Sequence, residues 1–177
     1  MDFVAIDFET AYWGEGSACA LGMVSGDREW FRLIRPYRMR FDINCVRVNG
    51  IYPEHVADEP AFPAFYDDVA SFLEGADVFA HNAKFDTGVL ASAIAVYGLP
   101  PIHFRAGDTV AIARKLWDLP NHRLNTVARH LNFSFHHHEA LDDARACAHI
   151  VRCAMEETKT ETPAEMMQAL GVAWKEI

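Results

Sequence analysis

Two acidic side chains share one short apolar stretch near the start of the chain. Over residues 3–10 (FVAIDFET), hydrophobic and polar residues alternate, which predicts a strand whose successive side chains face opposite sides. Asp7 and Glu9 then lie on one face, with Ile6 and Phe8 on the other. Carboxylates are costly to bury without a partner, and a hard cation such as Mg²⁺ or Mn²⁺ suits oxygen ligands. The alternative is a solvated edge strand with two surface acids.

A third acid, Asp86, follows a predicted strand at the start of a predicted helix. The run Ala80-His81-Asn82-Ala83-Lys84-Phe85-Asp86 joins a short buried strand to a segment with helical spacing. A negative charge near a helix N-terminus stabilises the helix by itself. Ligands in α/β folds also gather at strand ends, so Asp86 is a candidate for the same site as the two acids of the first strand.

The run His136-His137-His138-Glu139-Ala140-Leu141-Asp142-Asp143 offers two histidine–acid pairs of equal spacing. At about 100° per residue, the apolar stripe of the helix predicted over 140–155 places Asp143 at its margin and Asp142 on the opposite side, towards solvent. Asp143 is therefore the inward acid, and His138 is its companion from the preceding loop. Neighbouring histidines do not readily converge on one tetrahedral ion, and no cysteine stands near, so we do not expect zinc here.

The elements that must position these residues follow a mixed α/β pattern. Three antiparallel strands come first, followed by a long loop and then by alternating helices and strands. The loop is expected over 35–58, with at most one short helical turn. The predicted strands cover 3–10, 17–24, 29–34, 77–81 and 102–104, and the predicted helices cover 64–73, 85–97, 109–117, 124–131, 140–155 and 163–170.

Length and composition indicate one globular domain. The 177 residues are 51% hydrophobic and 23% charged, which suffices for one substantial core. We expect a single domain over 1–177, with the motif-bearing core over 1–157 and a closing helix and polar tail over 158–177. The four cysteines have no metal-ligand spacing, and no apolar run approaches the roughly 18 residues of a membrane span. We therefore expect a cytoplasmic protein without disulfides or membrane contact.

The net charge of −9 speaks against a protein that coats duplex nucleic acid by broad phosphate neutralisation. It does not exclude an enzyme that acts on nucleic acid. Clustered acids that bind two divalent cations would cancel several negative charges at the place where a phosphate must sit.

Taken together, three motifs resemble those of a known family. They are Asp7-Phe8-Glu9-Thr10, Asn82-Ala83-Lys84-Phe85-Asp86 and His138-Glu139-Ala140-Leu141-Asp142-Asp143-Ala144. Their order and spacing closely resemble the three exonuclease motifs of the DnaQ-like superfamily, in its histidine (DEDDh) subclass of 3′–5′ exonucleases. That subclass includes the epsilon proofreading subunit of bacterial replicative polymerase. The resemblance implies an RNase H-like fold, with a central mixed five-stranded sheet flanked by helices.

The resemblance also assigns roles to matching positions. Four carboxylates would bind two divalent cations, Mg²⁺ or Mn²⁺: Asp7, Glu9, Asp86 and Asp143. Asp7 would bridge the two cations, and His138 would act as a mobile general base. The segment Val48-Asn49-Gly50-Ile51 is similar to a family segment that usually reads Ile-His-Gly-Ile, with Asn49 in place of the histidine.

The expected reaction is hydrolysis of a phosphodiester at the 3′ end of single-stranded or frayed DNA, with release of 5′-mononucleotides. Stacking and backbone contacts, rather than charge, would hold the substrate end. Tyr12 and Trp13, in the turn after the first strand, are the leading candidates for stacking. Phe8 is expected in the core. The remaining expected contacts are Thr10, Asn82 and Phe85, and the basic residues that could meet phosphates are Lys84, Arg105 and Arg123.

Two alternatives stay open from the sequence. Within the enzyme class, the chain could be an exoribonuclease, because no motif settles how the site reads a 2′-hydroxyl. From another class, it could be a catalytically silent nucleic-acid-binding module, although a degenerate copy would usually have lost one of the acids. A polymerase or repair protein is compatible as a partner, and no motif encodes the oligomeric state.

Overall fold

The alternating first strand lies inside a six-stranded sheet in the computed structural model, which describes residues 3–177. The strands are β1 (Val4–Thr10), β2 (Ala18–Ser25), β3 (Arg28–Leu33), β4 (Asp77–Ala80), β5 (Arg105–Asp108) and β6 (Lys175–Glu176). Their order across the sheet is β3-β2-β1-β4-β5-β6. Because β1 pairs antiparallel with β2 and parallel with β4, the predicted mixed sheet with an antiparallel start is confirmed.

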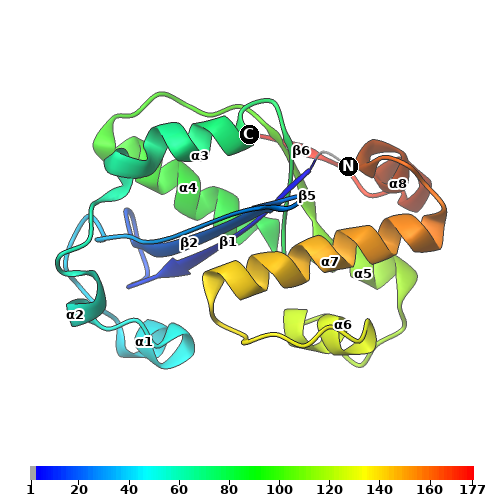
Figure 1. Cartoon of the computed structure of the whole chain (residues 1–177), viewed down its shortest axis with the longest axis horizontal. Coiled ribbons are helices and arrows are strands. Elements are labelled where there is room, and N and C mark those ends of the chain that lie inside the picture. Colours follow the sequence, from blue (N-terminus) through cyan, green and yellow to red (C-terminus); the bar gives the residue numbers. More distant parts are fainter. Residues whose placement is uncertain (1–2) are drawn as a thin grey trace.

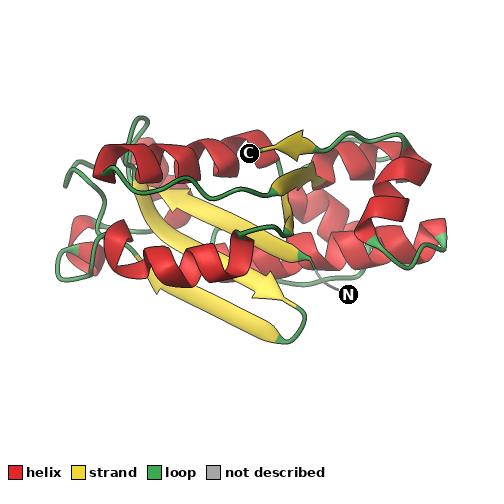
Figure 2. Ribbon diagram, turned by 90° about the horizontal axis from the view of Figure 1, so that it is seen from above, coloured by secondary structure: helices red, strands yellow, loops and turns green. Residues whose placement is uncertain are grey.

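Helices cover both faces of this sheet (Figures 1 and 2). They are α1 (Ile43–Asn49), α2 (Pro53–Val56), α3 (Tyr66–Leu73), α4 (Ala83–Tyr97), α5 (Thr109–Leu116), α6 (Leu124–His130), α7 (Ala140–Thr158) and α8 (Pro163–Leu170), with a 3₁₀ turn at Phe62–Phe65. α3 and α4 lie on one face, and α5, α6 and α7 lie on the other. The predicted α/β fold with flanking helices is confirmed.

The two faces of β1 belong to different hydrophobic clusters. Ile6 and Phe8 pack in the cluster that contains residues of α3 and α4. Ala5 packs in the cluster formed with residues of α5, α6, α7 and α8. Since Asp7 and Glu9 share the face of Ala5, β1 directs both acids towards the side of the sheet that α7 covers.

The start of α7 lies directly against β2. At Gly22 of β2, an added Cβ would lie 2.4 Å from the carbonyl oxygen of Ala140. A residue without a Cβ is therefore required for this close approach. The contact holds the first turn of α7, which contains Asp142 and Asp143, against the same part of the sheet that carries the acids of β1.

The segment predicted as a loop over 35–58 contains two short helices, so that prediction was wrong. α1 begins after Asp42, whose carboxylate accepts a hydrogen bond from the amide of Asn44 at 2.7 Å, and ends at Gly50, which has φ 68°. α2 begins with Pro53, a residue that suits the first turn of a helix. Helices this short are defined by their caps rather than by hydrophobic periodicity, which explains why periodicity missed them.

The strand predicted at 102–104 was placed too early, and the sheet has six strands rather than five. The ladder with β4 involves residues 105–108. At Gly107 an added Cβ would lie 2.4 Å from the ring of Phe79, so β5 requires a small residue and lacks the β-branched signal of a strand. β6 is two residues of the polar tail that pair with β5, and a strand this short has no readable sequence pattern.

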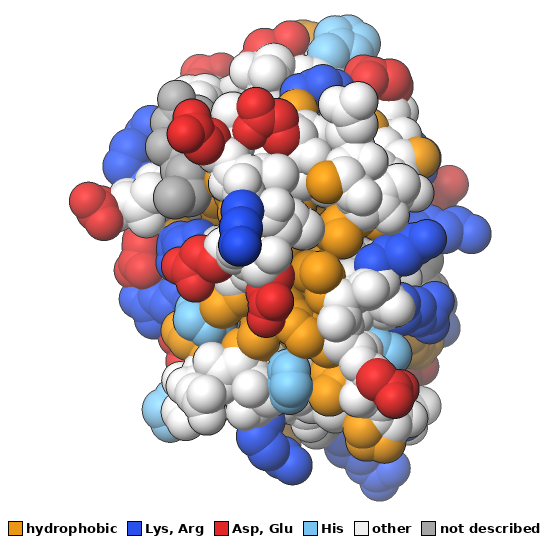
Figure 3. Space-filling view, turned by 90° about the vertical axis from the view of Figure 1, so that its right-hand side faces the viewer, with side chains coloured by type: hydrophobic (Ala, Val, Ile, Leu, Met, Phe, Trp, Pro, Cys, Tyr) orange, Lys and Arg blue, Asp and Glu red, His pale blue; other side chains and the backbone are white. Residues whose placement is uncertain are grey.

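Hydrophobic side chains also reach the surface on the side of the molecule that carries α5 and α8 (Figure 3). Partly buried residues that pack against the core in this region include Leu116, Leu119, Leu170, Val172 and Trp174. Within the described residues, no helix combines the length and apolar character needed to cross a membrane.

Candidate active site

The three motifs meet in one pocket at the carboxyl end of β1. The pocket has a volume of about 390 Å³, which lies within the range of small-ligand sites in proteins. Its walls come from β1, α1, the first turn of α4 and the loop before α7. The lining residues are Asp7, Phe8, Glu9, Thr10, Trp13, Asn44, Cys45, Val48, Asn49, His81, Phe85, Arg123, Leu124, His137, His138 and Asp143.

Three of the predicted metal-binding carboxylates converge in this pocket. Asp7, Glu9 and Asp143 each offer one oxygen, and these oxygens lie within 4.8 Å of one another. Asp7 is half-buried, whereas Glu9 and Asp143 are 8% and 4% exposed. Oxygen donors grouped in this way are the ligands that Mg²⁺ and Mn²⁺ prefer. The donor set therefore fits a hard divalent cation.

Asp86 is buried beside β1 but lies outside this group of oxygens. It stands in the first turn of α4 and is 1% exposed. One of its carboxylate oxygens accepts a hydrogen bond from the amide of Phe8 at 2.9 Å. The structure thus fixes Asp86 to the strand that carries Asp7, and its negative charge raises the pKa of Asp7.

Burial gives this cluster an unusual electrostatic state. Burial raises the pKa of Asp7 well above its usual value, and so does the negative charge of three neighbours, Asp86, Asp143 and Glu9. Burial also raises the pKa of Glu9 to about 7, although a hydrogen bond with Asn49 opposes the shift. Several buried carboxylates cannot all be ionised at neutral pH without a compensating positive charge. A bound divalent cation would supply that charge.

We expect the metal-free protein to lose stability as the pH rises. The pKa of Glu9 is raised from its usual value of 4.5 to about 7, so the native state keeps a proton on this carboxylate between these pH values. The unfolded chain has released it, so the native state binds more protons and the free energy of unfolding falls across this window. Glu9 alone accounts for roughly 3 kcal/mol of this change. Denaturation in EDTA at several pH values measures it.

Two comparisons test the cause of this decline. Mg²⁺ should flatten the pH dependence, because the cation stabilises the ionised carboxylates of the native state. Replacing Glu9 by Gln should reduce the decline in EDTA, since one titrating group has been removed. A free energy of unfolding in EDTA that rises between pH 4.5 and 7 would contradict the assignment of a raised pKa to Glu9.

Two neighbouring histidines contact Asp143 in different ways. Nδ1 of His137 lies 3.0 Å from both carboxylate oxygens of Asp143, whereas His138 donates its backbone N–H to them at 3.3 and 3.2 Å. The two rings stack, with their centroids 3.8 Å apart. The ring of His138 lines the pocket and makes no hydrogen bond within residues 3–177. That ring is therefore available to exchange a proton with a molecule in the pocket.

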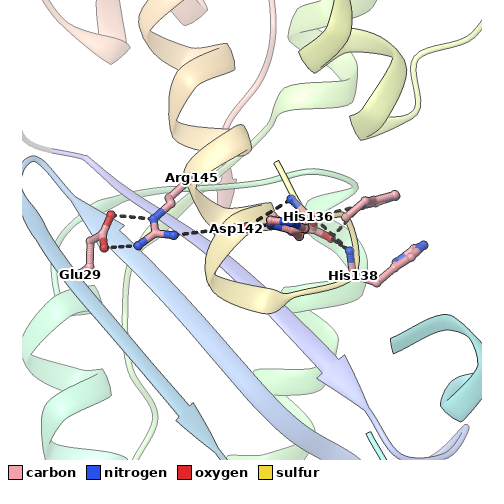
Figure 4. A network of polar contacts seen from close by, with 7 residues as sticks. Glu29, His136, His138, Asp142 and Arg145 are labelled. Carbon is pink, nitrogen blue, oxygen red and sulfur yellow. Dashed lines mark hydrogen bonds and ion pairs between the residues drawn. The ribbon is translucent and has the colours of Figure 1, made fainter. Parts of the chain in front are cut away.

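Asp142 belongs to a different network on the outer side of α7 (Figure 4). Arg145 joins Asp142 to Glu29 of β3, with bonds of 2.8 and 2.6 Å to the Glu29 carboxylate. Asp142 also accepts a hydrogen bond from the amide of His136 at 3.1 Å. As the helix-face analysis predicted, Asp143 points inwards and Asp142 outwards. The outer network ties the start of α7 and the histidine loop to the sheet.

The aromatic candidates for substrate contact occupy different environments. Trp13 is 69% exposed and borders the pocket. Tyr12 is buried, and its hydroxyl donates to the carbonyl oxygen of Glu15 at 2.7 Å, so it packs below the surface and does not line the pocket. Phe85 is half-buried and lines the pocket. Phe8 is in the core, as predicted.

Some of the polar and basic candidates for substrate contact line the pocket, and others do not. Thr10 lines the pocket, and its carbonyl oxygen accepts a hydrogen bond from Nδ2 of Asn49 at 3.0 Å. Asn49, which replaces the histidine of the similar family segment, therefore anchors α1 to the end of β1. Asn82 is exposed at the start of α4, with φ 72°, and is not part of the pocket lining. Of the isolated basic residues, Arg123 lines the pocket, whereas Arg105 pairs with Asp77.

Two histidines that the sequence analysis did not select as site residues, His81 and His137, also line the pocket. Both ring nitrogens of His81 are engaged, with Oγ1 of Thr109 and the carbonyl oxygen of His122, each at 2.9 Å. His81 is thus a structural residue of the wall. The contact between His137 and Asp143 had no signal in the sequence, because it depends on how the loop before α7 turns.

Two solved nucleases have a fold similar to that of this chain. Exonuclease X in complex with 5′ overhanging duplex DNA superposes with a TM-score of 0.74 at 22% identity, covering 96% of this chain and 99% of that one. The nuclease domain of 3′hExo, a DEDDh family member bound to rAMP, gives a TM-score of 0.73 at 17% identity, covering 88% of this chain and 92% of that one. At these identities the likeness concerns the fold, which is that of the RNase H-like nucleases.

Sequence relatives identify the family within that class. The exonuclease family model matches residues 4–151. The epsilon subunit of DNA polymerase III from Treponema pallidum is 30% identical over 156 residues, covering 82% of this chain and 72% of that protein. A PolC-type DNA polymerase III from Clostridium perfringens is 33% identical over 128 residues, which are 71% of this chain but 8% of that polymerase. The chain belongs to the DnaQ-like exonuclease family.

Proposed function

We propose that the chain is a divalent-metal-dependent 3′–5′ exonuclease that removes 5′-mononucleotides from single-stranded or frayed DNA ends. The convergence of Asp7, Glu9 and Asp143 in one pocket carries this proposal. Asp86, buried beside the same strand, completes the predicted set of four carboxylates. A silent binding module would not need to keep four mutually repelling acids, because each one costs stability when no cation compensates it.

The reaction requires a proton acceptor and a place for the terminal nucleotide. When bound, two divalent cations would activate the attacking water and stabilise the leaving 3′ oxygen. The ring of His138, which has no internal hydrogen-bond partner in residues 3–177, accepts the proton of that water. Burial lowers the pKa of His138, so its ring is neutral and able to act as a base at neutral pH. Trp13 and Phe85 border the space where the terminal base stacks.

The identity of the polymer rests on the relatives. Those described above are named as parts of DNA polymerase III, which supports DNA as the substrate and makes a DNA polymerase the first partner to test. The structural neighbours do not discriminate between the polymers, because one is bound to DNA and the other to rAMP. The neighbour bound to rAMP makes an exoribonuclease the second candidate function.

End-labelled oligonucleotides of DNA and RNA test the proposal directly. With Mg²⁺ or Mn²⁺, we expect 5′-labelled DNA to shorten stepwise from its 3′ end while mononucleotides are released, and EDTA should stop the reaction. Faster degradation of RNA than of DNA of the same sequence would favour the exoribonuclease. Equal degradation by the wild type and by an Asp7→Ala protein would point to a contaminant and refute the assignment of this site.

A further inference from the structure

One segment of this acidic protein is rich in positive charge. Residues 35–47 (RPYRMRFDINCVR) contain four of the 16 lysine and arginine residues in a chain of net charge −9. The arginines are Arg35, Arg38, Arg40 and Arg47, and all four are exposed. The single acid of this segment, Asp42, uses a carboxylate oxygen to cap α1. Four positive charges thus stand against one negative charge within the segment.

These arginines also lack partners elsewhere in the described structure. Within residues 3–177, none of the four forms an ion pair or a side-chain hydrogen bond. Two arginines elsewhere are engaged: Arg105 pairs with Asp77, and Arg145 pairs with Glu29 and Asp142. The exposed Arg114, Arg123 and Arg129 are unpaired within the described residues as well, but they are not clustered in one short segment. An arginine without an internal partner keeps its planar set of donors free for a carboxylate or a phosphate.

The arginine segment is fixed beside the candidate active site. The amide of Tyr37 donates to the carbonyl oxygen of Gly16 at 2.9 Å, and the amide of Asp42 donates to that of Ala11 at 2.8 Å. The segment is therefore tied to the turn that follows β1. The segment includes the first part of α1. In Figure 1, α1 lies at the end of the sheet where β1 finishes, away from α5 and α8.

Trp13 connects the two regions. It lines the pocket of the carboxylates, and it also lines an adjoining hollow together with Tyr37, Arg38 and Arg40. Glu15 is the one acid of that hollow, so two positive charges face one negative charge there. Exposed aromatic rings interleaved with positive side chains are the features with which proteins hold a single strand.

We propose that residues 35–47 form a strand-holding surface, on which Arg38 and Arg40 bind phosphates of the nucleotides upstream of the scissile bond. The inference rests on the proposed function, because a 3′ end held at the carboxylates leaves the rest of the strand on its 5′ side. A strand that leaves the pocket past Trp13 meets the two arginines next. The remaining surface, which carries the excess of negative charge, repels the same backbone.

Paired substrates of different length test this surface. The double variant Arg38→Gln/Arg40→Gln is compared with the wild type on a long single-stranded DNA and on thymidine 5′-monophosphate p-nitrophenyl ester, which has no upstream phosphate. We expect kcat/KM for the long strand to fall about tenfold at low salt, with no change for the ester. The matched control is Arg114→Gln/Lys115→Gln, an exposed pair on α5, which should leave both rates unchanged.

A binding measurement makes the result independent of catalysis. In an Asp7→Asn background, the affinity for the labelled strand is followed by fluorescence anisotropy against salt concentration. Loss of two phosphate contacts should reduce the slope of log K against log salt by about 1.4, at roughly 0.7 for each contact. The control pair should leave this slope as it is.

The outcomes separate this proposal from the proposed function. An unchanged rate on the long strand with an unchanged salt slope would overturn the strand-holding surface and favour another partner for the arginines, such as an acidic protein. An equal loss on both substrates would also overturn it, because the arginines would then act on the pocket itself. A wild type that cleaves neither substrate, yet shows the reduced salt slope on substitution, would refute the exonuclease and leave the surface standing.

Discussion

Replacing Asp7 by Asn is expected to lower the turnover of DNA at least about 10³-fold without unfolding the protein. In the proposed function, Asp7 would help to hold the cations together with Glu9 and Asp143. Metal stabilisation of a phosphoryl transition state is worth several kcal/mol, with about 1.36 kcal/mol for each factor of ten. In the absence of cations, the same substitution removes one of four mutually repelling carboxylates. The metal-free variant should therefore be as stable as the wild type or more so.

Activity and thermal unfolding measured together separate these two effects. Mg²⁺ should raise the melting temperature of the wild type, because it binds the native state alone, and should raise that of Asp7→Asn much less. The control is Asp142→Asn, an acid in the first turn of the same helix as Asp143 that bonds to Arg145 outside the pocket. It should keep nearly full activity. A variant at Asp7 that retains turnover would exclude this carboxylate as a metal ligand.

Replacing His138 by Gln is expected to reduce kcat by about 10² to 10⁴, the usual contribution of a general base. Replacing His137 by Gln should change kcat less than about tenfold. His137 bonds both oxygens of Asp143, so its ring competes with a cation for part of the acceptor capacity of this carboxylate. The variant at His137 should accordingly need less Mg²⁺ for half-maximal activity, because the cation no longer competes with an imidazole for this carboxylate.

The pH profile distinguishes the base from its neighbour. Burial lowers the pKa of His138 below its usual value near 6.5. At Mg²⁺ concentrations that saturate the carboxylates at every pH, the wild type should therefore lose activity only at pH values below that value, where the ring becomes protonated. His138→Gln should lack this acidic limb, and His137→Gln should retain it. Loss of turnover in the variant at His137, with normal turnover in the variant at His138, would reverse the two roles.

Regular periodicity made the central elements predictable. The alternation along β1 assigned Asp7 and Glu9 to one face before any fold was known, because side chains on a strand alternate strictly. The apolar stripe of α7 distinguished Asp143 from Asp142 for the same kind of reason, as the angular period of a helix is fixed. The end of α4 at Tyr97 was readable because Gly98 ends the helix in a left-handed conformation, whereas the helix begins at Ala83, two residues before the predicted start.

Elements without periodicity were not predictable. α1 and α2 are too short to show a hydrophobic stripe, and their caps lie in a segment dominated by turn-forming residues. β5 contains Ala106 and Gly107, which resemble a loop in isolation. They form a strand because they pair in parallel with β4, and the ring of Phe79 leaves room for nothing larger at Gly107. β6 exists because the tail returns to pair with β5.

The sequence by itself determined which residue types could do chemistry and which side of each element carries them, because these properties depend on local geometry that every strand and helix shares. The tertiary structure alone decided which of them meet. The same acids of β1 converge with Asp143 because α7 lies against Gly22, whereas Tyr12 turns into the core and Trp13 remains exposed. Contacts between distant segments depend on how the elements pack, and no local pattern encodes packing.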